Sequence, residues 1–152
     1  AARSVCVFCG ARPGNDPIYM QEATAVGQML VTEGWRLVYG AGDVGLMGAT
    51  ARAVQDAGGE TFGVIPAHLV AWEVGKRDLT QYIVVETMHE RKKVMFMNSD
   101  AIVVLPGGAG SLDEFFEVLT WRQLGLHQKP IFFVQSFDSL QDLRIALRAA
   151  LS

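Results

Sequence analysis

The chain has 152 residues, of which 50% are hydrophobic and 19% charged, and its formal net charge at pH 7 is -3. This profile is typical of one globular domain with an adequate core, so we expect residues 1–152 to form a single domain. Because Lys and Arg are scattered and the net charge is negative, no nucleic acid or anionic membrane is expected as a partner, although a compact anion could be held locally.

No apolar run approaches the roughly 20 residues of a membrane span, and the N-terminus lacks the features of a signal peptide, so the expected location is the cytoplasm. The chain begins without a Met and stops inside an expected helix, which is consistent with trimming at either end.

Six short apolar runs rich in β-branched residues recur along the chain. Their apolarity is continuous rather than alternating, which indicates strands covered on both faces, as in parallel sheets. The runs are VCVF (5–8), RLVY (36–39), TFGVI (61–65), YIVV (82–85), AIVVL (101–105) and IFFV (131–134).

Helical patterns fill most of the gaps between these runs. We expect helices from a cap at Asp16 and Pro17 to about 32, over 46–57, over 88–99, from Ser111 to Gly125, and over a last segment with leucines at 140, 143, 147 and 151. Gly34 and the pair at 58–59 should end the first two helices. This alternation predicts an α/β fold with a doubly wound, mostly parallel sheet flanked by helices. The long connection at 66–80 has no clear pattern, and such loops often belong to sites.

Cys6 and Cys9 have the C-x-x-C spacing of redox and zinc sites. A redox pair normally sits at a helix N-terminus, whereas SVCVFC reads as a buried strand. Zinc would need further ligands that are missing nearby. We therefore expect core cysteines and no bound metal.

Glycine-rich turns follow three of the expected strands, where ligands of open α/β sheets bind. The first is CGARPGND, and the second, GAGDVG at 40–45, matches the dinucleotide fingerprint G-x-G-x-x-G, with Glu60 about twenty residues further on. That fingerprint usually follows the first strand, and a dehydrogenase needs a substrate domain that this length cannot hold. We retain only its physical content, which is that glycines let the backbone N–H groups approach a ligand.

The third turn lies in LPGGAGSLDEF, residues 105–115, and has two interpretations. In the first, Ser111 and Glu114 form a capping box at the start of a helix. In the second, the glycines expose amides to an anion such as a phosphate, with Asp113 and Glu114 beside it. Carboxylates beside a phosphate suggest a ligand that also carries hydroxyls or a developing cation, and a ribose phosphate fits that description.

The segment MHERKKVMFMNSD places Arg91 on one helical stripe with Met88 and Met95. One interpretation is a surface helix in which Arg91 runs along the protein surface and Glu90 pairs with Lys93. The other is that Arg91 reaches the cleft formed with LPGGAGS. His89 is expected to be a structural hydrogen-bonding residue.

Five segments carry a specific resemblance over about 5–134, and they are CVFCGARPG, LVYGAGDVGLMGATA, GVIP, MHERK and LPGGAGSLDEFFEVLTWRQLGLHQKP. Together they resemble the LONELY GUY family of cytokinin riboside 5'-monophosphate phosphoribohydrolases, whose members have often been labelled lysine-decarboxylase-like. Lysine decarboxylation would need a Schiff-base lysine for pyridoxal phosphate, and no segment is laid out for one. The resemblance departs from the family at Ala11 and Arg12, where GAR replaces GSS, at GAG for GGG, and at Ser111 for Thr.

The resemblance implies a Rossmann-like homodimer that needs no cofactor. Its expected substrate is an N6-substituted adenosine 5'-monophosphate or AMP, cleaved to free base and ribose 5-phosphate. It implies Arg91 and Glu114 as the catalytic pair. The implied substrate contacts are Glu73, Lys92, Gly107, Gly108, Ala109, Gly110, Ser111, Leu112, Asp113 and Thr120.

Cleavage of a ribosyl bond builds positive charge on the sugar, which a carboxylate such as Glu114 can stabilise. Arg91 is permanently charged and is better suited to gripping and orienting than to proton transfer. Two alternatives stay open. One is a nucleotide-binding or carrier module without catalysis, and the other is a dinucleotide-dependent dehydrogenase.

Overall fold

A computed structural model describes residues 3–8, 17–40, 45–67, 81–105 and 128–152. All six expected strands are present, each within one residue of its expected ends. They are β1 (Ser4–Phe8), β2 (Arg36–Tyr39), β3 (Thr61–Pro66), β4 (Gln81–Val85), β5 (Ala101–Val104) and β6 (Ile131–Phe133). The described helices are α1 (Ile18–Thr32), α2 (Gly45–Asp56), α3 (Met88–Met97) and α5 (Leu140–Leu151), with a 3-10 turn η2 (Val134–Ser136) after β6. The helix expected at 111–125 lies outside the described residues.

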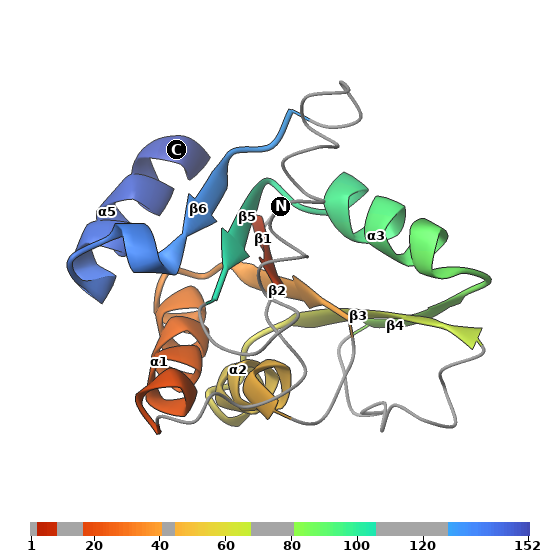
Figure 1. The fold of residues 1–152 in the computed structure, drawn as a ribbon, viewed down its shortest axis with the longest axis horizontal. Coiled ribbons are helices and arrows are strands. Elements are labelled where there is room, and N and C mark those ends of the chain that lie inside the picture. The colour runs from red at the N-terminus through yellow and green to blue at the C-terminus, as the bar shows by residue number, and fades with distance from the viewer. Residues whose placement is uncertain (1–2, 9–16, 41–44, 68–80, 106–127) are drawn as a thin grey trace.

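The six strands form one sheet in the order β4-β3-β2-β1-β5-β6, and every pairing is parallel. The chain first builds outward from β1 through β2 and β3 to β4, then crosses to the other side of β1 to add β5 and β6 (Figure 1). This is the expected doubly wound α/β architecture.

Both faces of the sheet are covered at β1, β2, β3 and β5, which explains why these strands are continuously apolar, whereas Ile83 and Val84 of the edge strand β4 are exposed among the described residues. Val5 and Val7 of β1 belong to a core shared with α1, α2 and α5, whereas Cys6 and Phe8 belong to a second core that includes Met95 of α3. Figure 1 shows α1 and α2 on one side of the sheet and α3 on the other. Cys6 is fully buried in the second core, as expected of a core cysteine, while Cys9 lies outside the described residues.

The ends of the helices largely follow the sequence signals. Gly34 and Gly58 adopt positive φ angles of 76° and 78° just beyond α1 and α2, where a residue with a Cβ would be strained. The helix expected at 88–99 is shorter in the structure, where α3 ends at Met97. Ser99 instead donates its hydroxyl to the carbonyl of Met95 at 2.7 Å, a local bond that competes with continuation of the helix. Val134, expected at the end of the last strand, begins η2.

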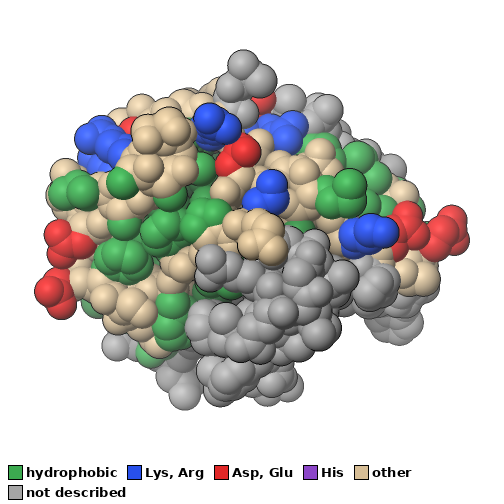
Figure 2. Space-filling model, turned by 90° about the horizontal axis from the view of Figure 1, so that it is seen from above, with side chains coloured by type: hydrophobic (Ala, Val, Ile, Leu, Met, Phe, Trp, Pro, Cys, Tyr) green, Lys and Arg blue, Asp and Glu red, His purple; other side chains and the backbone are tan. Residues whose placement is uncertain are grey.

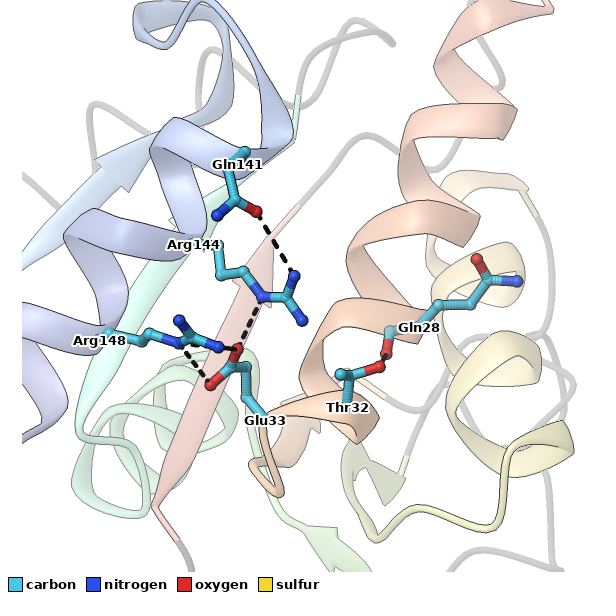
Figure 3. A network of polar contacts seen from close by, with 6 residues as sticks. All are labelled: Gln28, Thr32, Glu33, Gln141, Arg144 and Arg148. Atoms are coloured by element: carbon cyan, nitrogen blue, oxygen red, sulfur yellow. Dashed lines mark hydrogen bonds and ion pairs between the residues drawn. The ribbon is translucent and has the colours of Figure 1, made fainter.

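An ion cluster fastens α5 to the end of α1 (Figure 3). Glu33, the C-cap residue of α1, accepts from Nε of Arg144 at 2.7 Å and from Nε of Arg148 at 2.8 Å. The hydrogen bond and charge of Arg148, with those of Arg144, hold the pKa of Glu33 below its ordinary value. Leu143, Leu147 and Leu151 complete the attachment by burying one side of α5.

Charges on the surface are mixed. On the face seen in Figure 2, Lys and Arg side chains are interspersed with acidic ones, and hydrophobic side chains gather toward the end of the molecule that holds β6 and α5. The described side chains on this face form no continuous basic field of the kind that steers nucleic acid. Within the described part of the chain, no helix combines the length and apolarity needed to cross a bilayer.

Candidate functional site

The carboxyl ends of β1 and β5 lie side by side at the centre of the sheet. Phe8 pairs with Val104, and the backbone N–H of Leu105 donates to the carbonyl of Phe8 at 2.8 Å. The strand order reverses between these two strands, and such a reversal opens a crevice in which α/β proteins bind ligands. The glycine-rich segments at 9–14 and 106–110 follow these two strand ends in the sequence. Both segments lie outside the described residues, but the residues that precede them, Phe8 and Leu105, are hydrogen-bonded neighbours.

Helix α3 begins at the same carboxyl edge of the sheet. Only Glu86 and Thr87 separate the end of β4 from the start of α3, so the first turn of the helix stays near the strand ends. Thr87 is the N-cap, and its side chain accepts from the backbone N–H of Glu90 at 3.1 Å. The T-x-x-E spacing in the sequence is a signal for this helix start that the apolar pattern alone does not supply.

Arg91, in the first turns of α3, points inward over the sheet. Its Nε donates to the carbonyl of Val64 at 3.0 Å, and its Nη2 donates to the carbonyl of Gly40. Tyr39 of β2 pairs with Gly63 of β3, and the two carbonyls belong to the residues that follow them in the chain, Gly40 and Val64. The side chain is partly buried, which contradicts the interpretation of Arg91 as a cation running along the protein surface. The guanidinium therefore lies at the carboxyl edge, next to the strand ends where the ligand crevice is expected.

Lys92 is also partly buried, whereas Lys93 is exposed. The side chain of His89 is outside the described part of the molecule, and so are the other expected site residues. These are Glu73, Gly107, Gly108, Ala109, Gly110, Ser111, Leu112, Asp113, Glu114 and Thr120. The structure thus places Arg91 at the expected edge, and the assignments of Lys92 and of the remaining residues stay predictions.

The dinucleotide interpretation of GAGDVG fails at its acidic residue. In that fingerprint the acid stands at the carboxyl end of the strand that follows the helix. Glu60 is instead exposed just before β3, where its carbonyl accepts from the N–H of Leu37 at the opposite edge of the sheet. It cannot reach a ligand at the carboxyl edge, so the fingerprint match carries no dinucleotide site of this type.

Other features of the described residues lie away from this edge. A shallow groove of about 450 Å³ runs between α1 and α2, with Met20, Gln28 and Arg52 among its lining residues. No cluster of three or more His, Cys, Asp or Glu side chains able to hold a metal occurs among the residues that the structure describes. The candidate site therefore remains at the carboxyl ends of β1, β2, β3 and β5.

The fold is shared with solved structures of low sequence identity. The molybdenum cofactor carrier protein of Chlamydomonas reinhardtii superposes with a TM-score of 0.78 at 19% identity, covering 99% of both chains. The molybdenum cofactor binding protein of Rippkaea orientalis has a TM-score of 0.69 at 22% identity, covering 99% of this chain and 85% of that one. At these identities the likeness establishes the architecture alone.

Curated relatives are much more similar in sequence. The chain is 50% identical over 129 residues to the cytokinin riboside 5'-monophosphate phosphoribohydrolase of Rhodococcoides fascians, covering 84% of this chain and 65% of that protein. It is 46% identical over 129 residues to the enzyme of that name, LOG5, of Arabidopsis thaliana, covering 85% and 57%. It is 43% identical over 143 residues to the probable enzyme LOGL1 of Oryza sativa subsp. japonica, covering 94% and 64%.

The chain spans between about half and two thirds of the length of the curated relatives it matches. The model of the family described as "Possible lysine decarboxylase" matches residues 47–148, which is most of this chain. The family match and these relatives indicate the same family as the motifs around Arg91 and Glu114. The chain therefore belongs to the LONELY GUY family.

Proposed function

We propose that this protein hydrolyses the N-glycosidic bond of N6-substituted adenosine 5'-monophosphates, of AMP, or of both, releasing the free base and ribose 5-phosphate. The observation that carries the proposal is the 43–50% identity to proteins named as phosphoribohydrolases acting on cytokinin riboside 5'-monophosphates. The position of Arg91 at the carboxyl edge of the sheet supports it independently, because this is where the fold binds ligands.

The proposed substrate site joins residues from three parts of the chain. The backbone N–H groups of 107–113 would hold the 5'-phosphate at the start of the helix expected there. Lys92, Glu73 and Thr120 are proposed as further contacts to the substrate. The side chain of Ser111 would cap the helix while the neighbouring amides bind phosphate.

Glu114 is proposed to act on the ribose. Hydrolysis breaks the bond from C1' of the ribose to the base nitrogen, a water oxygen adds to C1', and the base leaves with a proton. Positive charge develops on the sugar as the bond breaks, and a carboxylate held beside it lowers the energy of that state.

Arg91 is proposed to grip and orient the nucleotide. A guanidinium keeps its charge throughout the pH range of the reaction, so it supplies a constant positive field and directed donors instead of a transferable proton. Its two bonds to backbone carbonyls hold the group in place before substrate arrives. A preorganised donor does not need to reorganise during the reaction.

We further propose that residues 1–152 act as one nucleotide-binding domain, that the protein works as a homodimer in the cytoplasm, and that AMP is among its substrates. Size-exclusion chromatography with light scattering tests the dimer. A mass near that of one chain would contradict it.

The decisive experiment incubates purified, folded protein with AMP and with isopentenyladenosine 5'-monophosphate and measures the free base by chromatography. Release of adenine or isopentenyladenine supports the proposal, and comparison of the two rates identifies the preferred N6 group. Saturable binding of both nucleotides without any release of base would instead identify a carrier or nucleotide-binding module, which is the alternative function for this fold.

A further inference from the structure

Gly40 lies directly against the guanidinium of Arg91. A Cβ added at Gly40 would stand 2.8 Å from Cζ and 3.0 Å from Nε of Arg91. Non-bonded carbon atoms do not approach this closely, because their preferred separation is about 3.5–4.0 Å. The space that a side chain would fill at position 40 is therefore already occupied by the guanidinium.

The backbone conformation does not by itself require glycine at this position. Among the glycines that the structure describes, positive φ angles occur at Gly34 and Gly58, and Gly40 is not one of them. An alanine is not excluded there by a positive φ. Among the residues that the structure describes, the three atoms nearest to an added Cβ at position 40 all belong to Arg91, which supplies a demand for glycine there.

We propose that Gly40 is a positioning residue for Arg91. Its missing side chain admits the guanidinium, and its carbonyl, together with that of Val64, accepts two of the guanidinium donors. Because those donors are fixed in one plane, two acceptors on neighbouring strands set both the position and the orientation of the group. The first glycine of GAGDVG thus serves an arginine, and not the pyrophosphate of a dinucleotide.

The consequence for catalysis rests on the proposed function. In Gly40→Ala the new methyl group displaces the guanidinium, which can swing away because it ends a flexible side chain. The protein therefore folds, but Arg91 no longer points at the site. Misplacement of an orienting group by about 1 Å can cost about 100-fold in rate, so we expect kcat/KM to fall by about that factor.

Gly59→Ala is the matched control. A Cβ there would stand 2.6 Å from Cγ2 of Val31 and 2.9 Å from Cγ1 of Val54, in packing near the amino edge of the sheet. We expect this variant to lower Tm while keeping the wild-type kcat/KM per folded molecule. Gly40→Ala should instead lose kcat/KM per folded molecule, and a Gly40→Ala protein with wild-type kcat/KM would overturn the proposal.

Rescue with added guanidinium separates positioning from general damage. In Arg91→Ala, millimolar guanidinium chloride should restore part of the lost kcat by occupying the vacated position against Gly40. In the double variant with Gly40→Ala the methyl group blocks that position, so no rescue is expected. Equal rescue in both backgrounds would contradict the role of Gly40.

A measurement without substrate keeps this inference independent of the proposed reaction. Gly40→Ala should lower Tm when Arg91 is present, because its two carbonyl bonds are lost, and leave Tm unchanged or raised in Arg91→Ala, where the space is empty. If wild-type protein releases no base but this coupling is found, the proposed function fails and the placement of Arg91 by Gly40 stands. Equal Tm shifts in both backgrounds would refute the placement whatever the activity.

Discussion

The N–H of Leu105 donates to the carbonyl of Phe8 at 2.8 Å, and this bond joins the ends of two strands that are far apart in the sequence. It means that CGARPGND and PGGAGS begin at neighbouring points of the sheet. The guanidinium of Arg91, bound above the ends of β2 and β3, lies along the same edge. These neighbouring starting points are the basis of the substrate site proposed above.

Replacement of Glu114 by Ala should lower kcat by about 10²–10⁴-fold, the range typical of losing a carboxylate that assists bond cleavage. The dimer proposed above should survive, since a helix can begin without this side chain. Steady-state release of base measures the loss, and light scattering checks the assembly. The control is Glu60→Ala, because Glu60 is exposed at the opposite edge of the sheet. Normal turnover in Glu114→Ala would reduce that residue to a helix cap.

Replacement of Arg91 should affect both activity and stability. Arg91→Ala loses the bonds to Val64 and Gly40, so the free energy of unfolding should fall by about 1–3 kcal/mol in urea denaturation. Arg91→Lys keeps the charge but has no planar fork, and its kcat/KM should stay well below wild type. Lys93→Ala, at an exposed position two residues on, is the control for a lost positive charge. Wild-type kcat/KM in Arg91→Lys would show that charge alone suffices.

The six strands can be predicted from the sequence because each is a short continuous apolar run, as expected where both faces of a strand are covered, which holds for β1, β2, β3 and β5. The sequence also identified Gly34 and Gly58 as helix ends, where the backbone takes positive φ. The expected helix at 88–99 wrongly includes Ser99. The spacing of apolar residues does not show that the Ser99 side chain donates back to the carbonyl of Met95.

The contact of Arg91 with Gly40 could not be predicted, because it depends on which strands are neighbours and on their register. Apolar patterns define elements but not the order of strands in the sheet. The attachment of α5 to Glu33 was missed for a similar reason. Its signal was the spacing of four between Arg144 and Arg148, which puts both on one side of a helix but does not name their partner.

The packing of α5 gives a prediction about stability. Leu147 is fully buried in the core shared with α1 and α2, whereas 55% of Ile145 is exposed. Leu147→Ala should lower the free energy of unfolding by about 2–5 kcal/mol, since it leaves a cavity. Ile145→Ala should change it by no more than about 0.5 kcal/mol. Urea denaturation of both variants measures the difference, and similar losses would mean that α5 is packed the other way round.

The cluster at Glu33 predicts how stability depends on pH. The pKa of Glu33 in the folded protein is lowered, chiefly by its hydrogen bond with Arg148 and also by Arg144, so its contribution is present above the ordinary pKa of 4.5 and lost as pH falls through the folded value. Glu33→Gln should therefore have a lower Tm than wild type at pH 7, and the gap should close on acidification below about pH 4.5. High salt should narrow the gap at pH 7, because the Arg148 side chain of the cluster is 55% exposed and salt screens exposed charges.

Thr32→Ala is the matched control from the same end of α1, since the Thr32 hydroxyl donates to the carbonyl of Gln28 and carries no charge (Figure 3). Its Tm difference from wild type should be the same at every pH, and a gap for Glu33→Gln that stays equally constant from pH 7 to pH 3 would rule out an ionic contribution of Glu33 to the attachment of α5.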